Sequence, residues 1–419
     1  MVVAKSHKKK QVFSTIVVFV LLIYPVLQTY GYDHYNFAFI IMTVLSILAL
    51  FRTGMKSYMP KLLNYYFLFW GLSHVLMASS ISSIIPIGVI RTYLVYNMLF
   101  KEFDYAKCLK IYNILVVIFL SFFFFQEFIY ASTGYRVLGV SQSLPLALDV
   151  EDASSHLEKM ITSERSSSFF SEPAHFVQFL LPLFALKLFK PLRRSDRVIV
   201  LGIFIALLLM QSGNALLGLA TIIVCFIFSK FFCIVNARKI IGLLLLSSIL
   251  AIGTFYYLKA DMGQYIIERQ DQLNADGDAQ SGQSGFLRIF RGYYVYGALS
   301  PIEMIIGADD IKRIDSAINS SGVAWAFKKN DYYFNVVQGL LIRTGVIGMV
   351  VFVLFLLWGL RKTDSCGKAI LLTFISLSFI SSLLFTPTMA LYLLLALSLK
   401  KKKGIDNDSK VLCIKTAKK

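Results

Sequence analysis

Charged residues are scarce in this sequence. They make up 16% of its 419 residues, whereas apolar residues make up 57%, against about 25% and about 45–50% in soluble domains. The apolar residues gather in long runs such as Val12–Leu27, Leu243–Leu258 and Val346–Leu360. As helices, these runs would cross most of the roughly 30 Å of bilayer hydrocarbon. The composition therefore indicates an all-α polytopic membrane protein rather than a water-soluble one.

Nucleotide-binding signatures are missing as well. The chain contains no G-x-x-x-x-G-K-[ST] motif, the pattern that cradles phosphates in P-loop proteins. The longest segment expected in the cytoplasm is the basic tail, residues 400–419, which is too short to fold around a nucleotide sugar. The energy for a reaction or for transport must then come from an ion gradient or from a substrate that arrives already activated.

Cysteines are few, and all of them fall in apolar runs or in lysine-rich connections. The five are Cys108, Cys225, Cys233, Cys366 and Cys413. No disulfide framework is therefore expected in outer loops. A cleaved signal peptide is not expected either, because the first apolar run ends in Tyr24–Tyr30 with no small-x-small site. We read that run as a retained first span.

Twelve apolar segments are predicted to be membrane-spanning helices, so that residues 1–419 form one integral membrane domain. The segment 332–360 is too long for one straight span, and its first half is expected to be interfacial or strongly tilted. The segments are 12–29, 36–51, 62–79, 82–100, 111–130, 173–189, 198–211, 214–232, 240–258, 332–360, 367–384 and 386–399.

The distribution of charge predicts one orientation for these spans. When the chain is threaded through them, 29 of the 42 lysines and arginines fall on one side, and 18 of the 24 acids fall on the other. Basic residues are retained in the cytoplasm, so both termini are expected there, in the inner membrane of a bacterium. The net charge of +18 is then a topology signal. Nucleic acid is not an expected partner, since no folded cytoplasmic domain would present the charge.

Two segments on the acidic side hold most of the polar sequence, residues 131–171 and residues 259–330. Loops of this length in a compact protein are usually functional or disordered. The second half of each is rich in apolar and aromatic residues, so we expect both to fold back over a cavity between the spans. In this topology they are two large periplasmic loops.

Arg288 and Arg291 are the first candidate substrate-binding residues. They are three residues apart, share one face if the segment is helical, and precede several tyrosines. Paired guanidiniums fit phosphate or pyrophosphate oxygens bidentately, and aromatic faces suit sugar rings. The alternative, of equal weight, is an amphipathic interfacial helix whose arginines contact anionic headgroups.

A second cluster lies where the first outer segment meets the next span. Arg165 and Glu172 flank a serine- and phenylalanine-rich stretch, Pro173 suits a first helical position, and His175 follows. The helix dipole would stabilise an ionised Glu172 carboxylate, which suits a catalytic base, and His175 is the other candidate. The alternative is an ordinary capping acid beside an interfacial histidine.

Two further arginines lie inside predicted spans. Arg91 is expected in mid-span, after Pro86 and Gly88. A charge at that depth costs at least about 2.5–3.5 kcal/mol unless it faces a wet cavity or a partner. We therefore predict that Arg91 binds an anion. Arg343 is given the same role, with snorkelling from a tilted helix as the alternative.

No metal site and no cofactor are expected. Asp276 and Asp278 lie in a glycine-rich linker, and the pair Asp309–Asp310 has no third ligand in view. His74 and Asn214 are interpreted as residues that form hydrogen bonds between helices.

Four short motifs give the chain a resemblance to a known family. An Arg-x(3)-Phe-Phe-x-Glu-Pro span start occupies 165–173, and a Ser-Gly-Asn-Ala span start occupies 212–215. A Pro-Ile-x(3)-Ile-Gly stretch follows at 301–307, and Asn-x(9)-Gly-x-x-Gly at 335–348 leads into a late span. With about twelve spans and two dominant outer loops, the layout resembles the Wzy-type O-antigen and capsule polymerases and the related O-antigen ligases.

The resemblance implies a GT-C-like fold and a metal-independent glycosyltransferase. Its reaction would join oligosaccharide repeats carried on undecaprenyl pyrophosphate, with inversion at the anomeric carbon. It also implies that loop arginines hold the lipid pyrophosphate, for which Arg165, Arg288 and Arg291 are the matching residues.

The expected partners are the lipid-linked donor and acceptor, membrane lipid and a chain-length regulator protein. An O-antigen ligase is the first alternative, although the histidine that ligases carry late in the large loop has no match in 259–330. A flippase for lipid-linked oligosaccharides is the second alternative, and it would fit short loops on both sides better.

Overall fold

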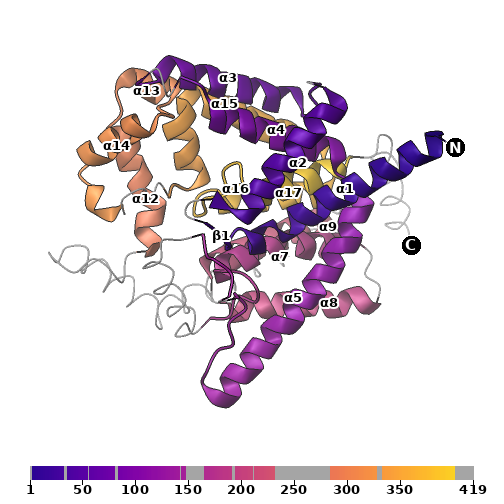
Figure 1. Ribbon diagram of the computed structural model, residues 1–419. Coiled ribbons are helices and arrows are strands. Elements are labelled where there is room, and N and C mark those ends of the chain that lie inside the picture. Colours follow the sequence, from indigo (N-terminus) through magenta and orange to yellow (C-terminus); the bar gives the residue numbers. More distant parts are fainter. Residues whose placement is uncertain are drawn as a thin grey trace, which may run out of the picture.

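The computed structural model describes residues 2–32, 35–54, 56–80, 84–141, 143–147, 165–190, 194–210, 212–231, 284–327 and 333–401. The described chain is mostly helical. Its two short strands, β1 (Gly31–Tyr32) and β2 (Tyr35–Asn36), pair in antiparallel fashion (Figure 1). The predicted all-α fold is therefore confirmed.

Helices occupy the apolar segments. In the first half of the chain they are α1 (Val2–Leu27), α2 (Phe37–Thr53), α3 (Lys61–Met77), α4 (Ile87–Glu102), α5 (Tyr105–Thr133), α7 (Pro173–Phe189), α8 (Arg194–Leu209) and α9 (Gly213–Phe231). In the second half they are α12 (Ser284–Gly297), α13 (Pro301–Ile306), α14 (Ile311–Ser320), the 3-10 helix η3 (Ala324–Ala326), α15 (Val336–Lys362), α16 (Ser365–Leu377) and α17 (Pro387–Ser398). The predicted span 240–258 lies outside the described residues.

Three helices are long and apolar enough to cross a membrane. They are Tyr105–Thr133, Gly213–Lys230 and Val336–Lys362. Other apolar helices have 10–17 residues, fewer than the roughly 20 that a straight crossing needs. By length and composition, the described residues thus support three spans, which is fewer than the twelve predicted.

Basic residues from helices far apart in the sequence meet at one end of the bundle. Lys107 Nζ donates to the Gln11 carbonyl at 3.2 Å, and Lys190 Nζ donates to the Tyr105 hydroxyl at 2.6 Å. Further contacts there pair Arg52 with Phe13, Lys101 with Tyr58, Lys187 with Asp196, and Lys362 with Lys401. These residues belong to segments that the charge count places on one side of the membrane.

Segments from the predicted outer side meet at the opposite end. Tyr30 forms a bridge with Leu146, and the amide and hydroxyl of Ser79 donate to Asp310 at 2.9 and 2.8 Å. In Figure 1 the start of α1 lies at the right, whereas α12, α13 and α14 lie at the left. The chain therefore alternates between two ends, as an antiparallel helical bundle does.

α7 is the centre of this bundle. Its residues from Phe176 to Leu186 are all buried, and it packs against α1, α5, α8, α9, α16 and α17. A helix that is apolar on every side is expected to be enclosed by others. The run Phe-Val-Gln-Phe-Leu-Leu-Pro-Leu-Phe-Ala-Leu has that property, since Gln178 is its one polar side chain.

Pro182 interrupts the hydrogen bonds of α7, and two tyrosines complete them. Proline has no N–H, so the carbonyl of Gln178, four residues earlier, loses its helical donor. The Tyr392 hydroxyl donates to that carbonyl at 2.9 Å, and the Tyr112 hydroxyl donates to the next one, of Phe179. Both tyrosines are fully buried. The apolar centre of the bundle thus contains a proline, and the carbonyl that loses its helical donor still accepts a hydrogen bond.

α15 is broken at Gly345, where φ is 61° and ψ is −169°. The run that is too long for one straight span is thereby divided into two helical pieces. A Cβ at Gly345 would overlap the Ile305 carbonyl, and a Cβ at Gly307, which ends α13, would overlap the Arg343 carbonyl. The end of α13 therefore packs directly against the break in α15. This close approach of two backbone segments requires glycine at both positions, because a side chain at either one would occupy the space of the other segment.

Residues 284–327, with α12, α13 and α14, form an outer subdomain. Its own small core consists of Val295, Leu299, Ala308, Ile314, Ala317 and Ile318, with Phe334 and Ile342. Ser300 and Glu303 form a capping box at the start of α13, and Arg313 NH1 donates to Glu303 Oε1 at 2.6 Å. Burial raises the pKa of Glu303, but hydrogen bonds from Ser300 and Arg313 outweigh it and bring the pKa below its usual value.

We predict that Tyr392→Phe lowers the free energy of unfolding by about 1–3 kcal/mol, because it leaves the buried Gln178 carbonyl without a donor. In a Pro182→Ala background the same change should cost much less, since residue 182 then supplies the helical N–H. Reversible unfolding of the purified protein in mixed detergent micelles measures both losses. Equal losses in the two backgrounds would show that the tyrosine does not replace the donor that proline lacks.

Candidate functional site

Glu172 occupies the N-cap position of α7. Its φ of −140° and ψ of 145° are extended, and Pro173 is the first helical residue. Its carbonyl accepts from the His175 and Phe176 amides at 3.2 and 3.5 Å, but its side chain makes no capping hydrogen bond. Within the described part of the chain, no side chain pairs with this half-buried carboxylate. Glu172 is thus a cap by position only.

His175 lies within the first turn of α7 and faces the end of α1. Its Nδ1 is 3.5 Å from Nε2 of Gln28 and 3.4 Å from the hydroxyl oxygen of Ser171. The imidazole is half-buried. Because Gln28 directly follows the last residue of α1, His175 joins the start of one helix to the end of another.

Arg91 lies at the same end of α1. α4 begins only after Pro86, so Arg91 is in the second turn of the helix, whereas the predicted span 82–100 had it near the middle. Its guanidinium carbon is 3.9 Å from the ring centroid of Phe39. Phe39 is in the first turn of α2, whose Phe37 amide donates to the carbonyl of Tyr30, just after α1, at 2.8 Å.

Three of the predicted site residues therefore lie near the C-terminal end of α1. Arg91 is there through its contact with Phe39, His175 approaches Gln28, and Glu172 precedes His175 by three residues. A cation, a carboxylate that no described side chain pairs with, and an imidazole near one helix end can bind an anionic group and accept a proton. Gln28 was missed in the sequence because it closes an otherwise apolar run.

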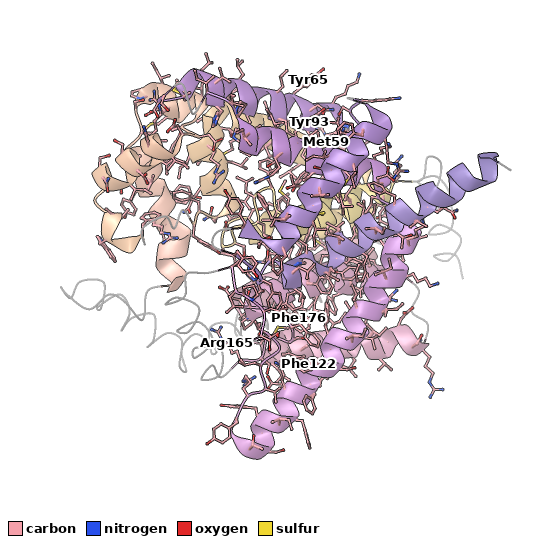
Figure 2. The ribbon with its side chains drawn as sticks, in the orientation of Figure 1. Met59, Tyr65, Tyr93, Phe122, Arg165 and Phe176 are labelled. Carbon is pink, nitrogen blue, oxygen red and sulfur yellow. The ribbon has the colours of Figure 1, made fainter. Side chains whose placement is uncertain are left out.

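Arg165 is exposed at the start of the stretch that leads to Glu172. Figure 2 labels it near Phe122 and Phe176, where α5 and α7 approach each other. The residues directly after it are buried, so the chain turns into the bundle at this point. Arg165 lies on the flank of the molecule that carries α7, away from the outer subdomain.

Arg291 is buried instead of being presented to a substrate. Its Nε and one terminal nitrogen donate to the Tyr333 carbonyl at 3.2 and 2.7 Å, and its guanidinium carbon is 4.4 Å from the Phe327 ring centroid. These contacts fasten α12 to the segment before α15. Arg288 is also on α12, but its side chain lies outside the described residues.

Arg343 belongs to a separate polar cluster between α3 and the outer subdomain. Its guanidinium is 3.6 Å from Asp309 Oδ1. The other oxygen of Asp309 accepts from Trp70 Nε1 at 2.8 Å and lies 3.1 Å from His74 Nδ1. His74 of α3 thus contacts the segment between α13 and α14. Asp309 was considered in the sequence only as a metal ligand, because nothing near it in sequence indicates these distant partners.

The predicted residues thus divide between two places. Glu172, His175 and Arg91 gather at the end of α1, whereas Arg291 and Arg343 hold the outer subdomain to the bundle. The first group is the better candidate for chemistry, because the charged side chains of the second bind other parts of the protein.

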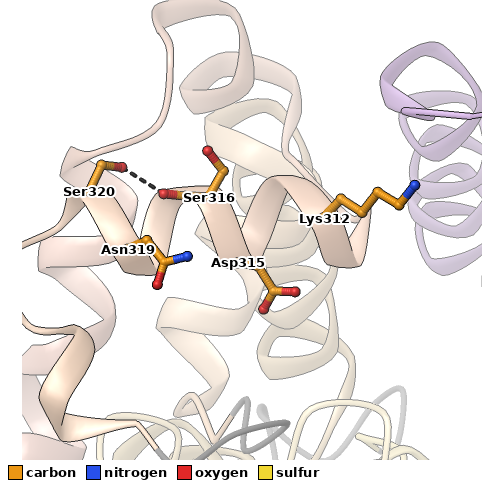
Figure 3. Close-up of a pocket in the computed structure, with 5 residues that line it drawn as sticks. All are labelled: Lys312, Asp315, Ser316, Asn319 and Ser320. Carbon is orange, nitrogen blue, oxygen red and sulfur yellow. Dashed lines mark hydrogen bonds between the residues drawn. The ribbon is translucent and has the colours of Figure 1, made fainter.

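A surface hollow of about 620 Å³ lies on α14 (Figure 3). Its lining residues are Lys312, Asp315, Ser316, Asn319 and Ser320. All come from one polar helix face, and none is a predicted site residue. Among the described residues, no three His, Cys, Asp or Glu side chains are grouped so that they could hold a metal ion.

We predict that Arg291→Ala lowers the free energy of unfolding by about 1.5–3 kcal/mol, since the Tyr333 carbonyl loses a charged donor. Arg291→Lys should recover only part of this loss, because an ammonium group cannot fork or stack as a guanidinium does. Arg165→Ala is the matched control and should change stability by less than about 0.5 kcal/mol. Unfolding in mixed micelles measures all three, and equal stability of the two alanine variants would contradict the structural role of Arg291.

A scan against protein-family models finds no match to this chain, and a search of curated proteins finds none either. A role for the end of α1 and the start of α7 therefore rests on the chain's own residues and their geometry.

Proposed function

We propose that this chain is a glycosyltransferase of the bacterial inner membrane that joins lipid-linked oligosaccharide repeats into O-antigen or capsular polysaccharide. The observation that carries the proposal is the Glu172 carboxylate at the start of α7, which pairs with no side chain of the described residues and lies three residues before His175. Arg91 lies near the same end of α1, so a base and a cation occupy one end of the bundle. The resemblance in sequence supplies the class of reaction.

In the proposed membrane arrangement, twelve spans form a GT-C-like bundle with both termini in the cytoplasm. The segments 131–171 and 259–330 then lie in the periplasm. The meeting of lysines and arginines at one end of the bundle supports this orientation, because basic residues are retained on the cytoplasmic side. Helices shorter than the hydrocarbon thickness can span it by local thinning of the bilayer and by snorkelling of their flanking residues.

In the proposed reaction, a hydroxyl of a fresh lipid-linked repeat attacks the anomeric carbon of the growing chain. A new C–O bond forms, Glu172 accepts the hydroxyl proton, and the bond from the anomeric carbon to the pyrophosphate oxygen breaks. The leaving group is undecaprenyl pyrophosphate, whose charge Arg91 and Arg165 stabilise. Its release supplies the energy of polymerisation.

We predict that Glu172→Gln lowers the rate of polymerisation by about 10²–10⁴-fold, since the amide keeps the shape of the side chain but cannot accept the proton. The assay uses purified protein with a lipid-linked repeat and scores ladder length on a gel. Glu303→Gln is the matched control, because it changes another outer carboxylate near a helix start, and its ladders should be normal.

The same assay tests the function itself. Ladders made by the wild type from the lipid-linked repeat alone exclude a flippase, which forms no bond, and a ligase, which needs a different acceptor. Near-normal ladders from Glu172→Gln would leave His175 as the better base, and His175→Asn would then show the loss.

The orientation has its own test. Single cysteines at Val150 and Gln280 should react with an impermeant thiol reagent in intact spheroplasts, and single cysteines at Lys56 and Arg193 should not. The expectation follows from the charge distribution. Labelling at position 56 or 193 would reverse the assignment of sides and remove Glu172 from the periplasmic face.

A further inference from the structure

The stretch just before Glu172 is buried within the bundle. Ser166, Ser167 and Ser168 expose 1%, 6% and 0% of their surface, and Phe170 exposes none. Polar groups at such depth persist only when other parts of the protein satisfy their hydrogen bonds. The bonds that hold this stretch therefore also fix the point at which α7 begins.

Gln126 of α5 is the first anchor of the stretch. The Ser168 N–H donates to Gln126 Oε1 at 2.9 Å, and Gln126 Nε2 donates to the Val137 carbonyl at 2.7 Å. The Ser168 hydroxyl donates to the Phe119 carbonyl at 2.8 Å. Since α5 ends at Thr133, Gln126 and Phe119 lie about 10 and about 21 Å from that end along the helix. The stretch thus dips deeply between α5 and its neighbours.

Arg136 is the second anchor. Its side chain is 2% exposed, and NH1 donates to Glu127 Oε1 at 2.8 Å. NH1 also donates to the hydroxyl of Ser166, and the guanidinium carbon is 4.1 Å from the ring centroid of Tyr130. One buried cation therefore ties the first residue of the buried stretch to two residues of α5.

The backbone at Ser168 shows how firmly the stretch is held. Its φ of 55° lies in the left-handed region that residues other than glycine usually avoid. Such backbone persists only where the surroundings over-determine it, and it is concentrated at functional sites. Gly139 permits the conformation, because a Cβ there would overlap the Ser168 carbonyl.

The ring of Phe170 connects the buried stretch to α7 by packing. This ring stacks on Phe176 with 5.0 Å between centroids and meets Phe119 edge-on at 5.4 Å. The amide of Phe176 in turn donates to the Glu172 carbonyl. Glu172 is therefore held from both sides, by the anchored stretch before it and by the first turn of α7 after it.

We propose that Arg136 is a positioning residue for Glu172, and that it aims the carboxylate by holding Ser166 against α5. The catalytic part of this inference rests on the proposed function, whereas the mechanical part does not. A buried ion pair adds little stability that apolar packing could not supply. The ion pair of Arg136 with Glu127 instead holds the start of the six residues that precede Glu172. A small displacement of these residues moves the Glu172 carboxylate.

The test compares Arg136→Gln and Arg136→Lys with Arg313→Gln, which breaks a similar ion pair in the outer subdomain. A Ser167→Cys reporter in the purified full chain measures how often the stretch opens, through its rate of reaction with a maleimide. In Arg136→Gln that rate should rise about tenfold or more, and in Arg313→Gln it should not change. The kcat of polymerisation should fall about 10²-fold with little change in KM, and Arg136→Lys should restore part of it.

The outcomes keep the two proposals apart. Equal reporter rates in Arg136→Gln and Arg313→Gln would overturn the positioning role whatever the activity. A faster reporter with unchanged kcat would also overturn it, because Arg136 would then support the fold alone. A faster reporter in a protein whose wild type makes no polymer would confirm the mechanical part and refute the polymerase. If Arg136→Gln does not fold, Glu127→Gln weakens the same pair and takes its place.

Discussion

A backbone polar group buried among apolar side chains needs a hydrogen-bond partner within the protein, and the irregular parts of this structure follow that constraint. Where Pro182 removes a donor from α7, Tyr392 supplies one from α17. Where Ser168 leaves regular geometry, Gln126 of α5 takes up its N–H. In both places a polar side chain from a helix distant in sequence supplies the hydrogen-bond partner that the local backbone lacks. These contacts connect the helices of the bundle, and the backbone departs from helical geometry at the places where such a partner is present.

The candidate site lies beside one of these departures. Glu172 follows a stretch that Gln126 and Phe119 of α5 hold at Ser168 and that Arg136 holds at Ser166, and its carboxylate is the first charged group after the buried serines. Arg91 and His175 lie near the same end of α1 and come from α4 and α7. The site is thus assembled from helix ends, which bundle packing places side by side and which leave unpaired polar groups by their nature.

Much of the helical fold follows from the sequence, because long apolar runs and their flanking lysines have few other solutions. The cap position of Glu172 was predicted from Pro173. The segment 332–360 was predicted to be too long for one straight span, with a tilted or interfacial first half, and the structure instead shows a break in α15 at Gly345. Helical spacing placed Arg288 and Arg291 on one face but could not tell whether that face is inward, since the answer depends on the Tyr333 carbonyl 42 residues away. The position of Arg91 in the second turn of α4 depends likewise on where that helix begins, which is at Ile87.

The partnership of Gln178 with Tyr392 has a consequence for biosynthesis. The tyrosine follows its acceptor by 214 residues, so about half of the chain is translated after α7 before this donor exists. Throughout that interval α7 is enclosed only in part, and the Gln178 carbonyl still lacks the hydrogen bond that Tyr392 later donates. The innermost helix is therefore completed by the last helix of the described chain, so its hydrogen bonds are all formed only after α17 has been synthesised.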